Sequence, residues 1–234
     1  MKPGDAAVEI GPGRGALTQG LLDAAGRLDA IEIDRDLAAS LRERFRARSG
    51  FVLHETDALR FDWRSLVRTP ATKLRLIGNL PYNISTPLLF RLLDAADVIR
   101  DMHFMLQKEV VDRIVAAPGS HAYGRLTVML APRATAVRVL DVGPGAFRPA
   151  PKVSSSVVRL TVGSFLPEWV RSALFGQIVQ AAFGQRRKTL RNALSRYLTA
   201  PQIAAIGIDP GARAETLRPE QFGALALAAA AMLH

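Results

Sequence analysis

The sequence has 234 residues, of which 49% are hydrophobic and 22% charged, as in globular proteins with one large core and room for a small second domain. The absence of cysteine excludes disulfides and thiolate metal sites, and the four histidines do not lie at metal-ligand spacing. A formal net charge of +10 favours an anionic partner, most commonly nucleic acid, and the alternative is a basic protein without an anionic partner. Met1 begins no signal peptide pattern, and the apolar run 222–233 is too short to cross a membrane, so a cytoplasmic protein is expected.

Apolar runs and helical patterns alternate over the first two thirds of the chain. In chain order, strands are expected at 6–10, 28–33, 51–54, 74–78 and 102–106, and helices at 16–25, 36–48, 86–93 and 109–116. Two further β-like runs follow each other without a helix, at 136–142 and 153–162. This order predicts an α/β fold with a mostly parallel sheet and helices on both faces, and it allows the last two strands to pair antiparallel at one edge.

The β pattern stops after Gly163, and helical patterns alone continue to the end. We therefore expect two domains, residues 1–163 and residues 164–234. Residues 163–234 carry 8 Lys and Arg against 4 Asp and Glu, so the helical part has the higher positive charge per residue.

A glycine-rich turn, Gly11-Pro12-Gly13-Arg14-Gly15, joins the first strand to the first helix, and Glu9 precedes it. Glycine lets the backbone turn sharply and approach a ligand closely. The spacing is G-x-G-x-G, whereas the dinucleotide pattern is G-x-G-x-x-G. A tight turn without a ligand explains these glycines equally well.

Two carboxylates follow the next strands. Glu32 lies 21 residues after Gly11, where a carboxylate accepts both hydroxyl protons of a ribose, in NAD or in S-adenosylmethionine. Asp57 follows the third strand, where it can accept a hydrogen bond from an adenine amine or serve as a helix N-cap. The alternative for Glu32 is an exposed carboxylate at a strand end.

The fourth strand runs into Asn79-Leu80-Pro81-Tyr82, whose residue types suit methylation of adenine. The exocyclic nitrogen is a poor nucleophile because its lone pair is delocalised into the ring. The Asn79 side chain and the Leu80 carbonyl, fixed by Pro81, can accept its two hydrogens and localise that lone pair. Tyr82 offers an aromatic face to a base removed from its stack. A dehydrogenase has no use for this motif.

Seven segments together resemble the KsgA family, the ribosomal RNA adenine dimethyltransferases of the small ribosomal subunit. They are VEIGPGRGALT, IEIDRDLA, NLPYNISTPLLF, DMHFMLQKEVVDRIVA, AYGRLTVM, AFRPAPKVSSSVVRL and AFGQRRKTLRNAL, and they span nearly the whole chain in order. NLPYNIST is highly specific to adenine dimethyltransferases of RNA, and the MHFMLQKEV and QRRKTLRN blocks favour KsgA over its Erm relatives, which act on large-subunit RNA.

The resemblance implies a Rossmann-like methyltransferase fold with a seven-stranded sheet and a small all-helical C-terminal domain. It implies S-adenosylmethionine as the cofactor and dimethylation of two adjacent adenosines near the 3' end of small-subunit RNA. The family's segment before the first strand, with its Gln-Asn-Phe-Leu motif, has no counterpart here, so weaker cofactor binding is expected. The implied cofactor-binding residues are Glu9, Gly11, Gly13, Glu32, Asp57, Ala58 and Asn79, and the catalytic residues are Asn79, Leu80, Tyr82 and Phe147. For Phe147, a core aromatic residue that anchors an edge loop is the alternative.

A basic run in the C-terminal part, residues 185–192, is expected to be helical and to contact RNA phosphates. Arg187 and Arg191 would then lie on one helix face by their i, i+4 spacing. A solvated helix face or internal salt bridges are the alternative. The expected RNA-binding residues are Arg186, Arg187, Lys188 and Arg191, with Lys108, Arg148 and Lys152 near the mouth of the active site.

The favoured interpretation is a monomeric enzyme, a ribosomal RNA adenine dimethyltransferase that acts on a precursor of the small subunit and takes part in ribosome biogenesis. A second interpretation is an assembly factor that acts mainly by binding. An NAD-dependent oxidoreductase is disfavoured by the glycine spacing and by the motif at Asn79, and an Erm-like resistance enzyme is the fourth candidate.

Overall fold

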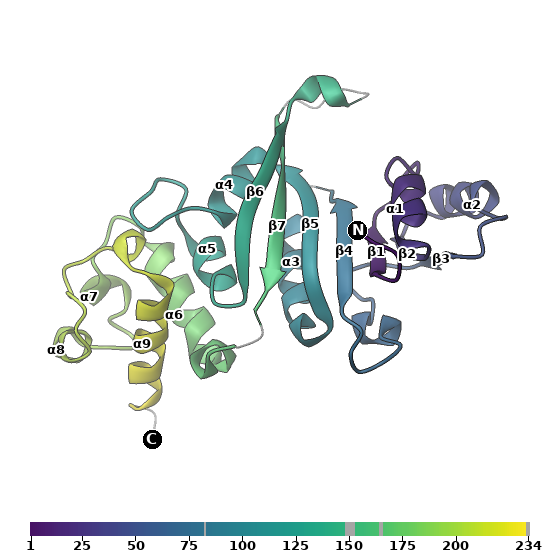
Figure 1. Ribbon diagram of the computed structural model, residues 1–234. Helices are drawn as coiled ribbons and strands as arrows, with labels where there is room; N and C mark the ends of the chain where they lie inside the picture. Colours follow the sequence, from purple (N-terminus) through teal and green to yellow (C-terminus); the bar gives the residue numbers. More distant parts are fainter. Residues whose placement is uncertain (82, 148–152, 164–165, 233–234) are drawn as a thin grey trace. The chain divides into compact units, whose positions relative to one another are not determined.

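The computed structural model describes residues 1–81, 83–147, 153–163 and 166–232 (Figure 1). The seven strands formed by these residues make one sheet in the order β3-β2-β1-β4-β5-β7-β6. Neighbouring strands from β3 to β5 are parallel, whereas β7 pairs antiparallel with β5. The expected Rossmann-like, mostly parallel sheet is thereby confirmed. The sheet is mixed, because β7 pairs antiparallel with β5. The strands are β1 (Ala6–Ile10), β2 (Leu28–Glu32), β3 (Phe51–Glu55), β4 (Leu74–Asn79), β5 (Ile99–Gln107), β6 (Ala134–Val142) and β7 (Ser155–Val162).

The first four α-helices follow the alternation expected from the sequence, with ends that differ by a few residues, whereas the helix at Arg125–Leu130 was not expected. The α-helices are α1 (Thr18–Ala25), α2 (Arg35–Arg44), α3 (Ser85–Leu93), α4 (Lys108–Ile114), α5 (Arg125–Leu130), α6 (Ala173–Gly184), α7 (Leu190–Ala193), α8 (Ala200–Ala205) and α9 (Pro219–Ala230). Short 3-10 helices are η1 (Trp63–Leu66), η2 (Ala96–Val98), η3 (Pro144–Ala146), η4 (Glu168–Arg171) and η5 (Ala214–Thr216). In the part of the chain that the structure describes, no helix is long and apolar enough to cross a membrane.

The centre of the sheet is buried because its strands have apolar residues on both faces. Every residue of β2 is buried, and α1 packs Leu22 and Ala25 into a cluster with Ala7 and Leu28 of the first two strands. Gly78 of β4 has a specific packing role, since a Cβ atom there would lie 2.5 Å from the carbonyl oxygen of Ile10. A glycine at this position therefore lets β4 approach the end of β1 closely.

The contacts divide the chain into two units, described separately below. The first comprises residues 1–111 and 137–162 and contains most of the sheet. The second comprises residues 112–136 and 163–232 of the described chain, whereas the sequence pattern assigns 112–136 to the first domain. The physical reason is the core of the second unit, in which Tyr123 and Val128 pack with residues of α6 and α9. The Tyr123 hydroxyl also donates a hydrogen bond to the Leu217 carbonyl at 2.7 Å.

Candidate cofactor and adenine site

The glycine-rich turn leaves β1 at the carboxyl end of the sheet. Gly11, Gly13 and Gly15 have φ angles of 65°, 57° and 79°, in the left-handed region that other residues rarely adopt. The Gly11 amide donates to the Ile31 carbonyl at 2.9 Å, which attaches the turn to β2. The three glycines are therefore needed for the backbone conformation of the turn. The turn lies close to the carboxyl ends of the strands.

Glu32, the last residue of β2, is buried beneath this turn. Its carboxylate accepts hydrogen bonds from the backbone amides of Gly13, Ile33 and Asp34 at 3.0–3.1 Å. The alternative of an exposed carboxylate at a strand end is therefore wrong. A negative charge fixed by three amides beside a glycine turn is an acceptor already oriented for hydroxyl donors.

Glu9 is a second buried carboxylate, one strand away. Thr18, the first residue of α1, donates its hydroxyl hydrogen bond to Glu9 at 2.7 Å, and both side chains are buried. Burial raises the pKa of Glu9 to about 7, with the charge of Glu32 acting in the same direction and the Thr18 hydrogen bond opposing it. The hydrogen bond between Glu9 and Thr18 therefore links the two ends of the turn between β1 and α1, and Glu9 gains or loses a proton near neutral pH.

Asp57 lies just after β3, in a turn rather than at the start of a helix. Its carboxylate accepts a hydrogen bond from the Leu59 amide at 2.9 Å, and Arg60 lies 3.9 Å away. The turn holds the half-exposed Asp57 side chain at the same end of the sheet as Glu32, while Ala58 is buried. The parallel register of β2 and β3, in which Glu32 pairs with Glu55, brings the two strand ends together.

Asn79 is the last residue of β4 and is exposed, whereas Leu80 beside it is buried. The backbone of Leu80 is fixed by its amide, which donates to the Met105 carbonyl of β5 at 3.2 Å. Asn79 is thus presented on a rigid strand end that Gly78 holds against β1. The carboxyl ends of β1, β2 and β4 carry Glu9, Glu32 and Asn79 to one edge of the sheet, as the sequence predicts.

Phe147 belongs to the connection between β6 and β7, directly after η3, and it is half-buried. Because Ser155 at the start of β7 pairs with Gln107 at the end of β5, this connection leaves the sheet at the edge where Asn79 lies. Lys108 begins α4 at that edge, and its amide donates to the Ser154 carbonyl at 2.9 Å. The predicted site residues Tyr82, Arg148 and Lys152 lie outside the described residues.

The helix expected over residues 185–192 is not formed, and this corrects the prediction from the sequence. α6 ends at Gly184, a turn follows, and α7 begins at Leu190, so Arg187 and Arg191 do not share a helix face. The break has a physical cause in backbone pairing, because the amides of Leu190 and Arg191 donate to the carbonyls of Ala212 and Pro210 instead of to a preceding helical turn.

The arginines of this segment differ in their contacts. Arg186 donates to the carbonyls of His121 and Tyr123 at 3.1 and 3.3 Å and lies 3.4 Å from Glu215, so it is occupied within its own unit. Arg187, Lys188 and Arg191 are exposed, and within the described ranges none of them has an ion-pair or side-chain hydrogen-bond partner.

Two residues that position the site are not identified by the sequence pattern. Thr18 looks like an ordinary helix residue, although it fixes Glu9, and Gly78 looks like part of a strand. A glycine inside a strand pattern is the signal that could have indicated a close backbone approach. Thr18 gives no comparable signal. Among the described residues there is no group of three His, Asp or Glu side chains that could hold a metal ion.

Comparison with known proteins gives one consistent family. A family model described as ribosomal RNA adenine dimethylase matches residues 1–230. Proteins named ribosomal RNA small subunit methyltransferase A are similar to this chain in Pseudomonas fluorescens (50% identical, over 94% of this chain and 80% of that protein) and in Methylococcus capsulatus (54% identical, over 92% and 83%).

Solved structures support the fold. The crystal structure of a dimethyladenosine transferase from Plasmodium falciparum is similar with a TM-score of 0.80 and 24% identity, over 96% of this chain and 90% of that one. The structure of the 23S rRNA methyltransferase ErmE is similar with a TM-score of 0.74 and 27% identity, over 97% and 92%.

Proposed function

The chain belongs to the ribosomal RNA adenine dimethylase family, and we propose that it transfers methyl groups from S-adenosylmethionine to the exocyclic amines of adenosines in ribosomal RNA. The proposed targets are two adjacent adenosines near the 3' end of small-subunit RNA. The observation that carries the proposal is the edge formed by Glu9, Glu32 and Asn79 with the glycine turn. The enzyme is an rRNA adenine dimethyltransferase.

The residues at this edge fit an adenosyl cofactor. The fixed carboxylate of Glu32 suits the two ribose hydroxyls, and Asp57 with the neighbouring Ala58 suits the amine edge of the cofactor's adenine. Gly11 and Gly13 allow the backbone to approach a ligand closely. When bound, S-adenosylmethionine supplies a methyl group attached to a positively charged sulfur.

The chain's own contribution to catalysis is to orient and activate the target amine. The Asn79 side-chain oxygen accepts one amine hydrogen, and the Leu80 carbonyl accepts the other. Both acceptors are held by β4, which Gly78 and the Leu80–Met105 hydrogen bond keep in place. Acceptors that are fixed before the reaction favour the tetrahedral amine of the transition state over the planar amine of the ground state. We include Tyr82 and Phe147 as the aromatic residues that contact the flipped base.

The choice of small-subunit RNA follows from the relatives. Those at 50% and 54% identity are named for the small subunit, whereas the large-subunit enzyme ErmE shares 27%. We propose that the chain acts in the cytoplasm as a monomer on a precursor of the small subunit. The exposed Arg187, Lys188 and Arg191 would then contact RNA phosphates. We also include Lys108, Arg148 and Lys152 among the proposed RNA contacts. Arg186 is better explained by its internal contacts.

The test is mass mapping of rRNA after small subunits that lack these methyl groups are incubated with the chain and labelled cofactor. The expected result is four methyl groups on two adjacent adenosines, because each amine takes two. Label on large-subunit RNA would indicate the ErmE-like activity instead. Tight binding to small subunits without any label would favour the binding-only assembly factor.

A further inference from the structure

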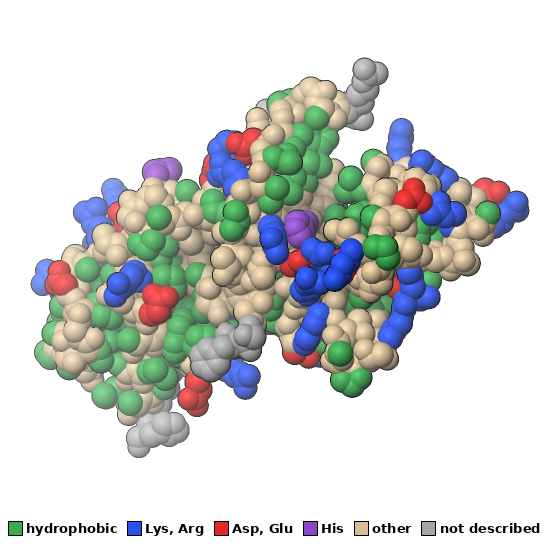
Figure 2. All heavy atoms as spheres, in the orientation of Figure 1, with side chains coloured by type: hydrophobic (Ala, Val, Ile, Leu, Met, Phe, Trp, Pro, Cys, Tyr) green, Lys and Arg blue, Asp and Glu red, His purple; other side chains and the backbone are tan. Residues whose placement is uncertain are grey.

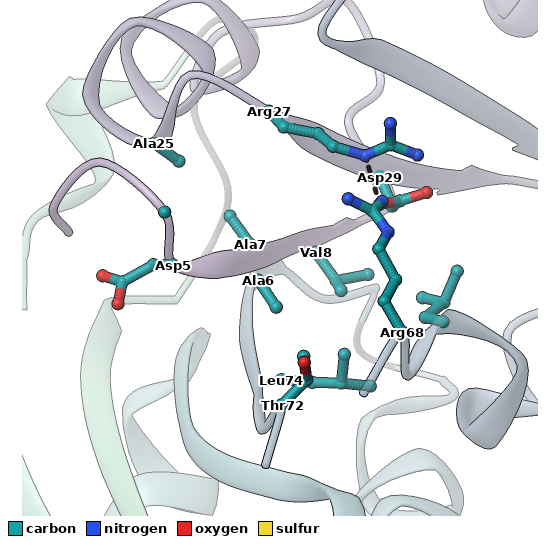
Figure 3. Close-up of a pocket in the computed structure, with 12 residues that line it drawn as sticks. Asp5, Ala6, Ala7, Val8, Ala25, Arg27, Asp29, Arg68, Thr72 and Leu74 are labelled. Carbon is teal, nitrogen blue, oxygen red and sulfur yellow. Dashed lines mark hydrogen bonds and ion pairs between the residues drawn. The ribbon is translucent and has the colours of Figure 1, made fainter. Parts of the chain in front are cut away.

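The first unit contains a cavity at the amino ends of its parallel strands, opposite to the carboxyl ends where the cofactor site lies. Its lining comes from the beginnings of β1, β2 and β4 and from the segment before β4, and its volume is about 160 Å³. Figure 3 shows Arg27 and Arg68 reaching towards each other across Asp29 on one side of it. Alanine, valine and leucine side chains form much of the remaining wall, including Ala6, Val8 and Leu74.

The polar side of this cavity carries an excess of positive charge. Asp29 is buried and receives contacts from three cationic or ionisable groups, at 3.0 Å from Arg68, 3.7 Å from Arg27 and 3.0 Å from His54. One carboxylate neutralises one of the two guanidinium groups. The other carboxylate in the lining, Asp5, lies 2.8 Å from Arg75 and 3.6 Å from Arg100. Arg75 also pairs with Asp101 at 2.9 Å, so these two arginines balance these two carboxylates and leave the excess charge at Arg27 and Arg68.

The arrangement places the carboxylate inside and the guanidinium groups outside. The side chain of Asp29 is 9% exposed, whereas those of Arg27 and Arg68 are 46% and 50% exposed. A guanidinium has five N–H donors in a planar fork, and the contacts with Asp29 use few of them. Asp29 therefore fixes Arg68 by a hydrogen bond of 3.0 Å and attracts Arg27 over a longer distance of 3.7 Å, and both guanidinium groups stay half-exposed at the cavity.

We propose that this cavity and its two arginines form a phosphate-binding site, separate from the cofactor and adenine site. Paired guanidinium forks suit the oxygens of a phosphate group, and the hydrogen bond from Arg68 to Asp29 orients one of the two forks before a phosphate binds. The phosphate source that fits the proposed function, on which this inference rests, is the backbone of the substrate RNA, which would then contact the first unit at two opposite edges. Figure 2 shows further Lys and Arg side chains over the β4 and β5 part of this unit.

The experiment compares Arg27→Ala/Arg68→Ala with a control, Arg46→Ala/Arg91→Ala, which removes two exposed arginines elsewhere in the same unit. Binding of a small-subunit RNA fragment is measured from low to moderate salt. If both arginines contact phosphates, the slope of log affinity against log salt becomes shallower by roughly 1.4–1.8 in the cavity variant and changes little in the control. An equal change in the two variants would overturn RNA contact at the cavity.

Inorganic phosphate is titrated in parallel to identify the source of the phosphate. Binding of free phosphate to the wild type but not to the cavity variant, with unchanged RNA binding, would assign the site to a small phosphate ligand. If neither RNA binding nor phosphate binding differs between the cavity variant and the wild type, the proposal is overturned. Melting curves accompany each variant, and Arg27→Ala alone, which removes the longer contact to Asp29, replaces the double variant if that fails to fold. Cofactor affinity is expected to be unchanged in all variants, so this result is independent of the methyl-transfer test.

Discussion

Glu9 and Thr18 form a buried hydrogen bond of 2.7 Å between the end of β1 and the start of α1, and it spans the whole glycine turn. Nothing in the periodicity of α1 singles out Thr18, yet its hydroxyl donates to a carboxylate that would otherwise be costly to bury. The Glu9–Thr18 hydrogen bond therefore also positions the candidate site, because the turn that it spans carries the Gly13 amide, which donates to Glu32.

Stability should depend on pH through Glu9. Burial raises its pKa from the usual 4.5 to about 7, so the folded protein keeps a proton that the unfolded chain releases. The resulting stability is complete below pH 4.5 and is lost as pH rises through about 7, by up to about 3 kcal/mol. Glu9→Gln should remove this loss. Denaturant unfolding of the wild type and of Glu9→Gln at pH 5 and pH 8.5 measures this difference. An equal fall in the free energy of unfolding in the two proteins would contradict the role of Glu9.

Glu32→Gln should weaken binding of S-adenosylmethionine by about ten-fold or more, because hydrogen bonds to a charged acceptor contribute roughly 1.5–3 kcal/mol each. Glutamine is preferred to alanine here, since alanine would also leave three backbone amides without their acceptor. Glu55→Gln is the matched control, because Glu55 ends the neighbouring strand in register with Glu32. Calorimetric titration of the three proteins decides, and equal affinities would place the ribose elsewhere.

Much of the first unit could be predicted from the sequence, since apolar runs next to glycine turns predict a strand at 6–10, as observed, and one at 28–33, observed at 28–32. The carboxyl-end placement of Glu32 and Asn79 follows from parallel topology alone. The turn at residues 185–189 could not be predicted, because the helical pattern there is overridden by hydrogen bonds to Pro210 and Ala212, distant in sequence. The packing of 112–136 with the C-terminal helices is also a long-range effect.

Asn79→Ala should reduce methyl transfer by roughly 10²–10³-fold while cofactor affinity stays largely intact, because its acceptor acts mainly in the transition state. Asn83→Ala removes an exposed asparagine four residues further on and serves as the control. Single-turnover rates on small subunits, with cofactor saturating, measure the effect. Full activity in the Asn79 variant would show that the assigned mechanism is wrong.

The second unit offers a comparison between neighbouring arginines with different contacts. Arg187→Ala/Arg191→Ala removes two exposed cations, so the slope of log RNA affinity against log salt should become shallower by roughly 0.7–0.9 for each phosphate that an arginine no longer neutralises, at unchanged melting temperature and cofactor affinity. Arg186→Ala removes the donor to the His121 and Tyr123 carbonyls, so it should lower the melting temperature instead.

Salt-dependent binding and melting curves on the two variants and the wild type separate these roles. If Arg187 and Arg191 cover a solvated surface, the salt slope will match that of the wild type, and Lys108, Arg148 and Lys152 become the next residues to test. If the double variant instead shows a lower melting temperature together with weaker RNA binding, then the defect is structural and the phosphate contacts are not supported. The expected result is a shallower salt slope in Arg187→Ala/Arg191→Ala at unchanged melting temperature, and a wild-type salt slope in Arg186→Ala. This outcome would show that the turn after α6 presents Arg187 and Arg191 to RNA, whereas Arg186 attaches the turn to its own unit.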